Sequence, residues 1–309
     1  ALFAVGNSLT ELAIARALIG LGVSACLMAS FKSFSQWFGG ERQASLNAAI
    51  MAAGGLGALT ASTPLAWAIP QFGWRAVFVT LAVAGVAAAA GIFSTPEKPG
   101  SARPEPVRSQ IAGLVEVLAS RVFWRYAPLS TLNIGGLMAL QGLWAVPWLM
   151  NFSGLSRSAA AAHLLLMGGG MLAGSLAIAF GVAPLARRGI TPQRLLQVGM
   201  GLGLLASLLI VLDARPSEPL WFMLGLIFAV GNLSYALLQR HYAVTLAGRV
   251  NTALNLMVFI GAFCIQWGFG AAVDALQAGG YALRAAYQIT FGGLLALQVA
   301  SWLWFLRKA

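Results

Sequence analysis

Charged residues are scarce in this sequence. They make up 9% of its 309 residues, and only eight of them are acidic. A soluble domain usually carries about 25% charged residues, so this chain has too few to cover a surface in contact with water. Hydrophobic residues reach 59% and the mean hydropathy is +0.81, which indicates a protein that folds in a lipid bilayer.

Residues that bind metals or form disulfides are equally few. The two cysteines, Cys26 and Cys264, lie inside apolar segments and offer no disulfide framework. There are two histidines, no phosphate-binding glycine motif and no plausible set of catalytic side chains in the apolar segments. We therefore expect no metal site, no cofactor and no enzymatic activity. The basic residues are spread over many loops, so a nucleic-acid partner is not expected either.

Long apolar runs are what the sequence has in abundance. A helix rises about 1.5 Å per residue, so a run of about 20 apolar residues crosses about 30 Å of hydrocarbon. Nine runs meet this requirement and are too uniformly apolar for barrel strands, which predicts an all-α, polytopic transmembrane helix bundle. The runs are Leu12–Phe31, Ala44–Trp67, Ala76–Gly91 with its flanks, Ala127–Met150, Ala159–Ala183, Leu195–Leu212, Leu220–Leu238, Ala253–Val273 and Tyr287–Phe305.

The basic residues predict the orientation in the membrane. Of the 19 lysines and arginines, fourteen fall in loops on one side and four on the other, while Arg16 lies within a run. The side with more positive charges is expected to be cytoplasmic. We expect a multi-pass protein of a bacterial inner membrane, in contact with lipid and monomeric.

A hydrophilic stretch divides the chain. Residues 94–108 are rich in proline and charge, and a helical apolar spacing follows them. This pattern predicts three parts: residues 1–93 as the remainder of an N-terminal half, residues 94–126 as a cytoplasmic linker with a helix on the membrane surface, and residues 127–309 as a C-terminal half of six helices.

Two short echoes indicate an internal duplication. Arg42 and Arg249 begin similar segments 207 residues apart, and Arg75 and Arg284 begin a second similar pair 209 residues apart. Duplicated halves are common among membrane transporters. Matching the halves leaves three helices, or roughly 80 residues, without a counterpart at the start, so we expect them to precede this sequence.

Several motifs together resemble the major facilitator superfamily. Arg16, Gly20 and Gly22 match its R-x-x-x-G-x-G pattern in the fourth helix, and Arg42 follows a Trp-Phe pair as in the next loop. Gly73–Phe78 resembles the entry to its sixth helix. The resemblance implies helices 4–12 of a fold with twelve helices in two halves.

The sequence also departs from the family pattern. The segment that ends in Arg187 and Arg188 lacks the acidic residue of the family's loop motif. Arg249 is the counterpart of Arg42 in the corresponding loop of the second half. The antiporter signature of the fifth helix is broken at residues 57–64. The missing acid leaves the gating role of that loop without support in this sequence, and the broken antiporter signature weakens a drug-export interpretation.

Polar residues inside the apolar runs are the candidates for function. In this superfamily helices 4, 7 and 10 line the transport path, so the resemblance implies that Arg16 takes part in coupling. The alternative is that Arg16 only extends to the membrane surface. At 100° per residue, the polar and aromatic residues of helix 7 share one face, as do those of helix 10, although the same groups can also serve as hydrogen bonds between helices. The cavity candidates are Asn133, Gln141, Trp144, Trp148, Asn232, Tyr235 and Gln239.

The function indicated is secondary active transport of a small solute by alternating access. One buried cation favours ion-coupled uptake of a polar or anionic organic molecule. Glu11 is the acid in this sequence that could carry a coupling proton, unless the coupling group lies in preceding helices. The alternatives are a multidrug or metabolite efflux antiporter and a membrane fragment or scaffold that does not transport.

The charge asymmetry makes a testable prediction about topology. A reporter that is active only in the cytoplasm should be active when fused at Gly100 or Ala309 and inactive when fused at Pro216. Activity at Pro216 combined with none at Gly100 would reverse the orientation.

Overall fold

The computed structural model describes most of the chain as helix. The described residues are 1–24, 26–37, 46, 50, 53–54, 56–57, 60–61, 63–96, 107–243 and 246–307, and they contain no strand. The chain forms two units, Ala1–Glu105 and Pro106–Ala309. The division falls within the expected linker. Eleven of the 24 residues in the expected span 44–67, together with Arg42, lie outside the described residues.

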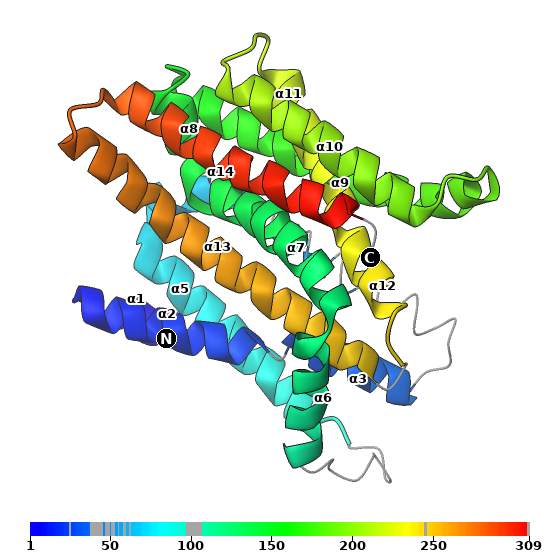
Figure 1. Ribbon diagram of the computed structural model, residues 1–309. Helices are drawn as coiled ribbons and strands as arrows, with labels where there is room; N and C mark the ends of the chain where they lie inside the picture. Colours follow the sequence, from blue (N-terminus) through cyan, green and yellow to red (C-terminus); the bar gives the residue numbers. More distant parts are fainter. Residues whose placement is uncertain are drawn as a thin grey trace. The chain divides into compact units, whose positions relative to one another are not determined.

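The first unit is built from four described helices (Figure 1). They are α1 (Leu2–Val5), α2 (Leu9–Ser24), α3 (Cys26–Trp37) and α5 (Thr63–Phe93). The short α1 packs on α5, where the rings of Phe3 and Phe78 lie 4.4 Å apart between centroids. Gly73 has φ of 76° and bends α5 near its start, a conformation that glycine adopts without a steric penalty.

The second unit holds the larger set of helices (Figure 1). They are α6 (Val107–Ala119), α7 (Arg121–Ala139), η1 (Leu140–Trp144), α8 (Ala145–Asn151), α9 (Arg157–Arg187), α10 (Pro192–Val211), α11 (Glu218–Phe228), η2 (Ala229–Asn232), α12 (Leu233–Gln239), α13 (Ala247–Ala278) and α14 (Leu283–Leu306). The two η segments continue their neighbours, so α7 with α8 and α11 with α12 each make one span. The helix expected after the linker is present as α6, and its Val117 is buried in the core of the unit.

The expected membrane spans agree well with the helices. Among the described residues, seven helices are long and apolar enough to cross a membrane, and they coincide with the seven runs predicted from Ala76–Gly91 onward. The first expected run, Leu12–Phe31, falls on α2 and α3, which are shorter and do not meet the same criterion. Seven of the nine expected spans are therefore confirmed.

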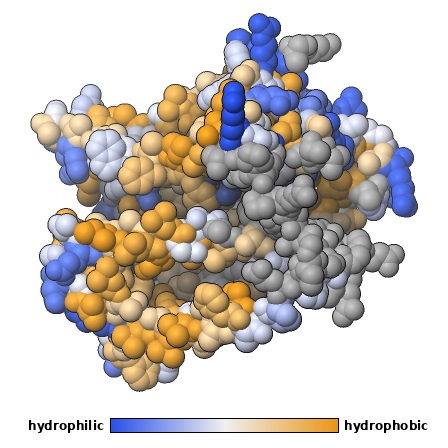
Figure 2. All heavy atoms as spheres, turned by 90° about the horizontal axis from the view of Figure 1, so that it is seen from below, coloured by the Kyte–Doolittle hydropathy of each residue, from blue (hydrophilic) through white to orange (hydrophobic). Residues whose placement is uncertain are grey.

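Apolar side chains cover much of the surface as well as the interior. Phe180 on α9 is 77% exposed and Trp267 on α13 is 73% exposed, and both lie in the middle of long helices. Figure 2 shows hydrophobic residues over much of one face, with the hydrophilic ones gathered mainly towards its edges. A fold that is apolar inside and outside is the one expected for helices surrounded by lipid.

Glycines allow the closest helix contacts of the second unit. Gly170 and Gly174 of α9 form a G-x-x-x-G pair, and Gly225 of α11 faces them. A Cβ atom at Gly170 would collide with the backbone carbonyl of Phe222, and one at Gly225 with the carbonyl of Met167. The two backbones are in direct contact, as is common where small residues line an interface between membrane helices.

A comparison of two glycines tests this contact. Gly225→Ala should lower the melting temperature of the purified protein, because overpacking of this kind costs about 1–3 kcal/mol. Gly169→Ala should leave it unchanged or raise it, because alanine favours a helix by up to about 1 kcal/mol. Gly169 has no atom within 4 Å of an added Cβ. Equal effects of the two substitutions in a thermal unfolding assay would contradict the packing described.

Candidate functional site

Two spans of the second unit contain turns that are not α-helical. Between α7 and α8 the backbone makes a π turn at Leu140–Trp144, and between α11 and α12 it makes a 3₁₀ turn at Ala229–Asn232. Gln141 lies in the first turn and Asn232 closes the second. Turns of both kinds inside a long helix often occur at functional sites or hinges.

The π turn changes which residues of helix 7 share a face. Asn133 and Trp148 are fully buried and pack against α14. The Asn133 amide donates to Leu129 O at 2.8 Å and to Ser301 Oγ at 3.2 Å, and the Trp148 ring lies 4.9 Å from that of Phe291. The prediction that these residues share one face assumed a turn of 100° per residue. That angle does not hold across a π turn.

Trp144 contacts both α13 and α14, because its ring also lies 6.3 Å from that of Tyr287 of α14 between centroids. The Trp144 indole N–H donates to Gln266 O of α13 at 2.8 Å, and its ring stacks on Phe269 at 4.8 Å between centroids. Gln141 is half-buried and forms no hydrogen bond with a described residue. The indole N–H of Trp148 also has no hydrogen-bond partner among the described residues, but it is fully buried. Gln141 is thus the candidate on helix 7 that is both partly exposed and without a hydrogen bond to a described residue.

The candidates on helix 10 remain together on one side of the span. Asn232 is exposed on the second unit, and Tyr235 and Gln239 are half-buried on the following turns. The Tyr235 hydroxyl donates to Asn255 Oδ1 of α13 at 3.1 Å. Asn255 is not among the candidates from the sequence, because its partner comes from another helix and leaves no signal in the local spacing.

The basic candidates differ in their surroundings. Arg16, on α2, is exposed on the first unit and makes no hydrogen bond or ion pair with a described residue. An added Cβ at Gly20 or Gly22 would meet no atom within 4 Å. Arg187 and Arg188 are exposed at the end of α9, where positive charge is favourable. Arg249 of α13 lies against Gly113 of α6.

Glu11 acts as a helix cap in this structure. Its Oε2 accepts a hydrogen bond from Asn7 N at 2.8 Å, and Ser8 Oγ accepts one from Glu11 N at 3.2 Å. This reciprocal arrangement satisfies the free N–H groups at the start of α2. The hydrogen bonds from the amides of Asn7 and Ser8 lower the pKa of the Glu11 carboxyl below its ordinary value of 4.5. A carboxylate held ionised in this way is poorly suited to carry a proton near neutral pH.

His163 links two helices of the second unit. It is buried on α9, where its Nδ1 lies 2.8 Å from Ala159 O and its Nε2 lies 3.0 Å from Ser217 Oγ. Both ring nitrogens therefore have partners inside the protein. Within the described part of the chain, no group of three or more His, Cys, Asp or Glu side chains gathers where a metal ion could be held.

The two echoing arginines occupy similar positions in their units. Arg75 donates to Gly6 O at 3.2 Å and to Asn7 Oδ1 at 3.0 Å, in the loop that precedes α2. Arg284 pairs with Asp213 at 3.0 Å, in the loop that precedes α11. Arg75 follows the bend of α5 at Gly73 by two residues, and Arg284 lies at the start of α14. In both units an arginine of the last described helix thus holds the loop before a corresponding helix, as a duplication predicts.

These features define a multi-pass α-helical membrane protein of the transporter class. A sequence model of the Major Facilitator Superfamily matches residues 1–265. The chain belongs to this family, which confirms the resemblance seen in its motifs. A search of curated proteins gives no match.

A solved structure supports the same fold. The chain is similar to the crystal structure of a bacterial homologue of the human lysosomal transporter Spinster, in an inward-facing and unoccupied conformation. The TM-score is 0.63 at 16% sequence identity, and the match covers 98% of this chain and 78% of that one. At this identity the likeness concerns the fold.

The cap at Glu11 makes a local prediction. Glu11→Ala removes the acceptor for the amides of Asn7 and Ser8, so hydrogen exchange in residues 6–12 should become faster at neutral pH. Glu11→Gln keeps a side-chain oxygen and should have a smaller effect. Glu116→Ala, at an exposed acid on α6, serves as the control. If Glu11→Ala leaves the exchange unchanged by mass spectrometry, the capping role is wrong.

Proposed function

We propose that this protein is a secondary active transporter that takes up a small polar or anionic organic solute by alternating access, driven by an ion gradient. The setting is a bacterial inner membrane. Belonging to the Major Facilitator Superfamily supports the transport mechanism. The nature of the solute follows from the polar residues that the second unit leaves unpaired.

The observation that carries the proposal is the position of Gln141 and Asn232. Each lies on a turn that interrupts the regular backbone of a long apolar helix. Polar side chains in a membrane are costly unless they are paired or face water, so amides left without partners in the unit favour a water-filled path. Irregular backbone at the middle of a transporter helix is a common feature of substrate sites.

The pair Tyr235–Asn255 extends this polar surface. Its hydrogen bond joins α12 to α13 and leaves further lone pairs and donors for a solute. Gln141, Asn232, Tyr235 and Gln239 can thus offer both donors and acceptors. We assign solute binding to these four, and we assign Asn133, Trp144 and Trp148 to supporting them, because their contacts lie within the unit.

Arg16 supplies the positive charge in this proposal. An arginine that is exposed on an apolar helix and has no partner among the described residues of its unit is available to an anion or to a carboxylate. We therefore assign coupling to Arg16, with Gly20 and Gly22 leaving open space beside it. The lowered pKa of Glu11 favours a coupling group other than Glu11.

Cysteine labelling distinguishes a water-lined face from one that faces lipid. In a background with Cys26 and Cys264 replaced by serine, Asn232→Cys should react with a membrane-impermeant, water-soluble maleimide. Leu205→Cys should not, although Leu205 is 51% exposed, because it lies on an apolar groove between α10 and α14. The measurement is the labelled fraction in membrane vesicles.

Protection from labelling then identifies the solute class. A panel of small organic anions and neutral polar solutes should contain at least one compound that slows labelling at Asn232→Cys. Protection by lipophilic cations alone would favour the efflux alternative. Equal labelling at positions 232 and 205 would show that this face is not a water-lined path, and the binding residues named above would be dropped.

A further inference from the structure

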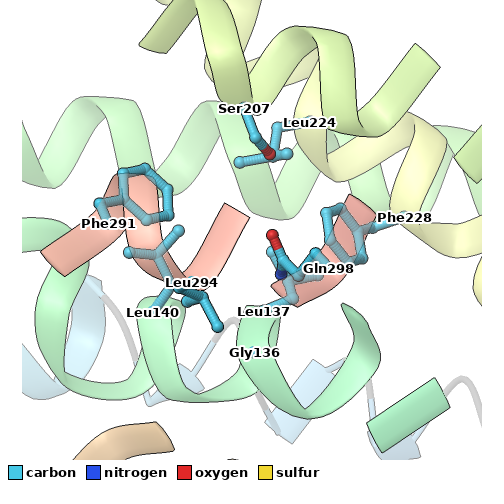
Figure 3. Close-up of a pocket in the computed structure, with 9 residues that line it drawn as sticks. All are labelled: Gly136, Leu137, Leu140, Ser207, Leu224, Phe228, Phe291, Leu294 and Gln298. Carbon is cyan, nitrogen blue, oxygen red and sulfur yellow. The ribbon is translucent and has the colours of Figure 1, made fainter. Parts of the chain in front are cut away.

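A small cavity lies within the second unit, and none of the candidate residues just described lines it. Residues of α7, η1, α10, α11 and α14 line it, and most of its wall is leucine and phenylalanine (Figure 3). It offers about 10 Å³ to a water-sized sphere, which is roughly the space that one water molecule needs. The cavity is too small for an organic solute.

Two polar side chains project into this apolar space. Ser207 of α10 and Gln298 of α14 are each 3% exposed, and Figure 3 shows the oxygen atoms of both directed into the cavity. Gln298 Oε1 is buried without a hydrogen-bond partner in the protein. Ser207 Oγ also makes no hydrogen bond with a described residue, whereas Ser175 of α9 donates to the carbonyl of Met171 in the usual way.

The Gln298 side chain is fixed from its other end. Its Nε2 donates to Leu132 O of α7 at 3.0 Å, so its Oε1 cannot turn away to another donor without losing that bond. The backbone carbonyl of Gln298 accepts from Ser301 Oγ at 2.7 Å, and Ser301 in turn accepts from Asn133. The unpaired oxygen is thus the end of a polar chain that runs from α7 into α14.

We propose that one water molecule occupies this cavity, accepting a hydrogen bond from Ser207 Oγ and donating one to Gln298 Oε1. An unpaired amide oxygen is costly in an apolar interior, and buried waters are found where they satisfy such groups. The water links α10 to α14 and, through Gln298, to α7. A hard cation does not fit, because such ions take about six oxygen ligands and the described residues around the cavity offer two side-chain oxygens.

Radiolytic labelling tests the site with water itself as the probe. A short X-ray pulse generates hydroxyl radicals from bound as well as bulk water, and these oxidise the side chains beside them. Phe291 lines the cavity and is 2% exposed, while Phe123 is fully buried in another part of the unit. In the purified protein, Phe291 should be oxidised several-fold faster than Phe123. Equal rates would overturn the proposal.

A serine substitution makes the test specific to the proposed hydrogen bonds. Ser207→Ala removes one partner of the water, so oxidation at Phe291 should fall. Ser234→Ala is the matched control, because the Ser234 hydroxyl is buried but already bonded to Ser130 and Gly231. An unchanged rate at Phe291 in Ser207→Ala would overturn the assignment. A high-resolution experimental structure should also show density within hydrogen-bonding distance of Ser207 Oγ and Gln298 Oε1.

Discussion

The need to pair every polar group inside the protein governs this structure. Hydrocarbon offers no hydrogen bonds, so the backbone must form helices and polar side chains must find partners on neighbouring helices. Trp144 bonds to a carbonyl of α13, and Trp302 of α14 donates to Gln197 O of α10. Glycines also hold helices together, because they bring the backbones of α9 and α11 into direct contact without any polar side chain.

The membrane spans could be predicted because they depend on length and hydropathy alone. The face of helix 7 could not be predicted. The residues that share a face follow from the spacing only where each residue turns the helix by the same angle. The π turn at Leu140–Trp144 breaks that constancy, and Asn133 before it and Trp148 after it are both buried against α14. No residue type in this segment marks a π turn in a single sequence. The sequence identified Gln141 as polar and intramembrane, and the structure adds that it lies on the irregular turn.

Pairs formed between distant helices were also beyond prediction. The sequence contained the echo of Arg75 and Arg284, and the structure shows each arginine binding the loop before a corresponding helix. Such a contact needs two segments that are far apart in sequence, so spacing alone does not reveal it. The capping motif of Ser8 and Glu11 is different, because both residues lie within one turn and follow a recognisable pattern. A local motif such as this cap can be recognised in a sequence, whereas contacts between distant helices cannot.

In the proposed function, the paired polar residues of the second unit support the site and the unpaired ones bind the solute. Asn133, Ser130 and Ser234 are buried and bonded to neighbouring helices, which favours a unit that moves as one body. Gln141 and Asn232 are less buried and lack such bonds on the two spans whose backbones are irregular. Alternating access requires both properties, because a rigid half must carry a surface that exchanges its partners between water, solute and the opposite half. The proposed transport function therefore rests on which polar side chains are paired and which are exposed, more than on how many there are.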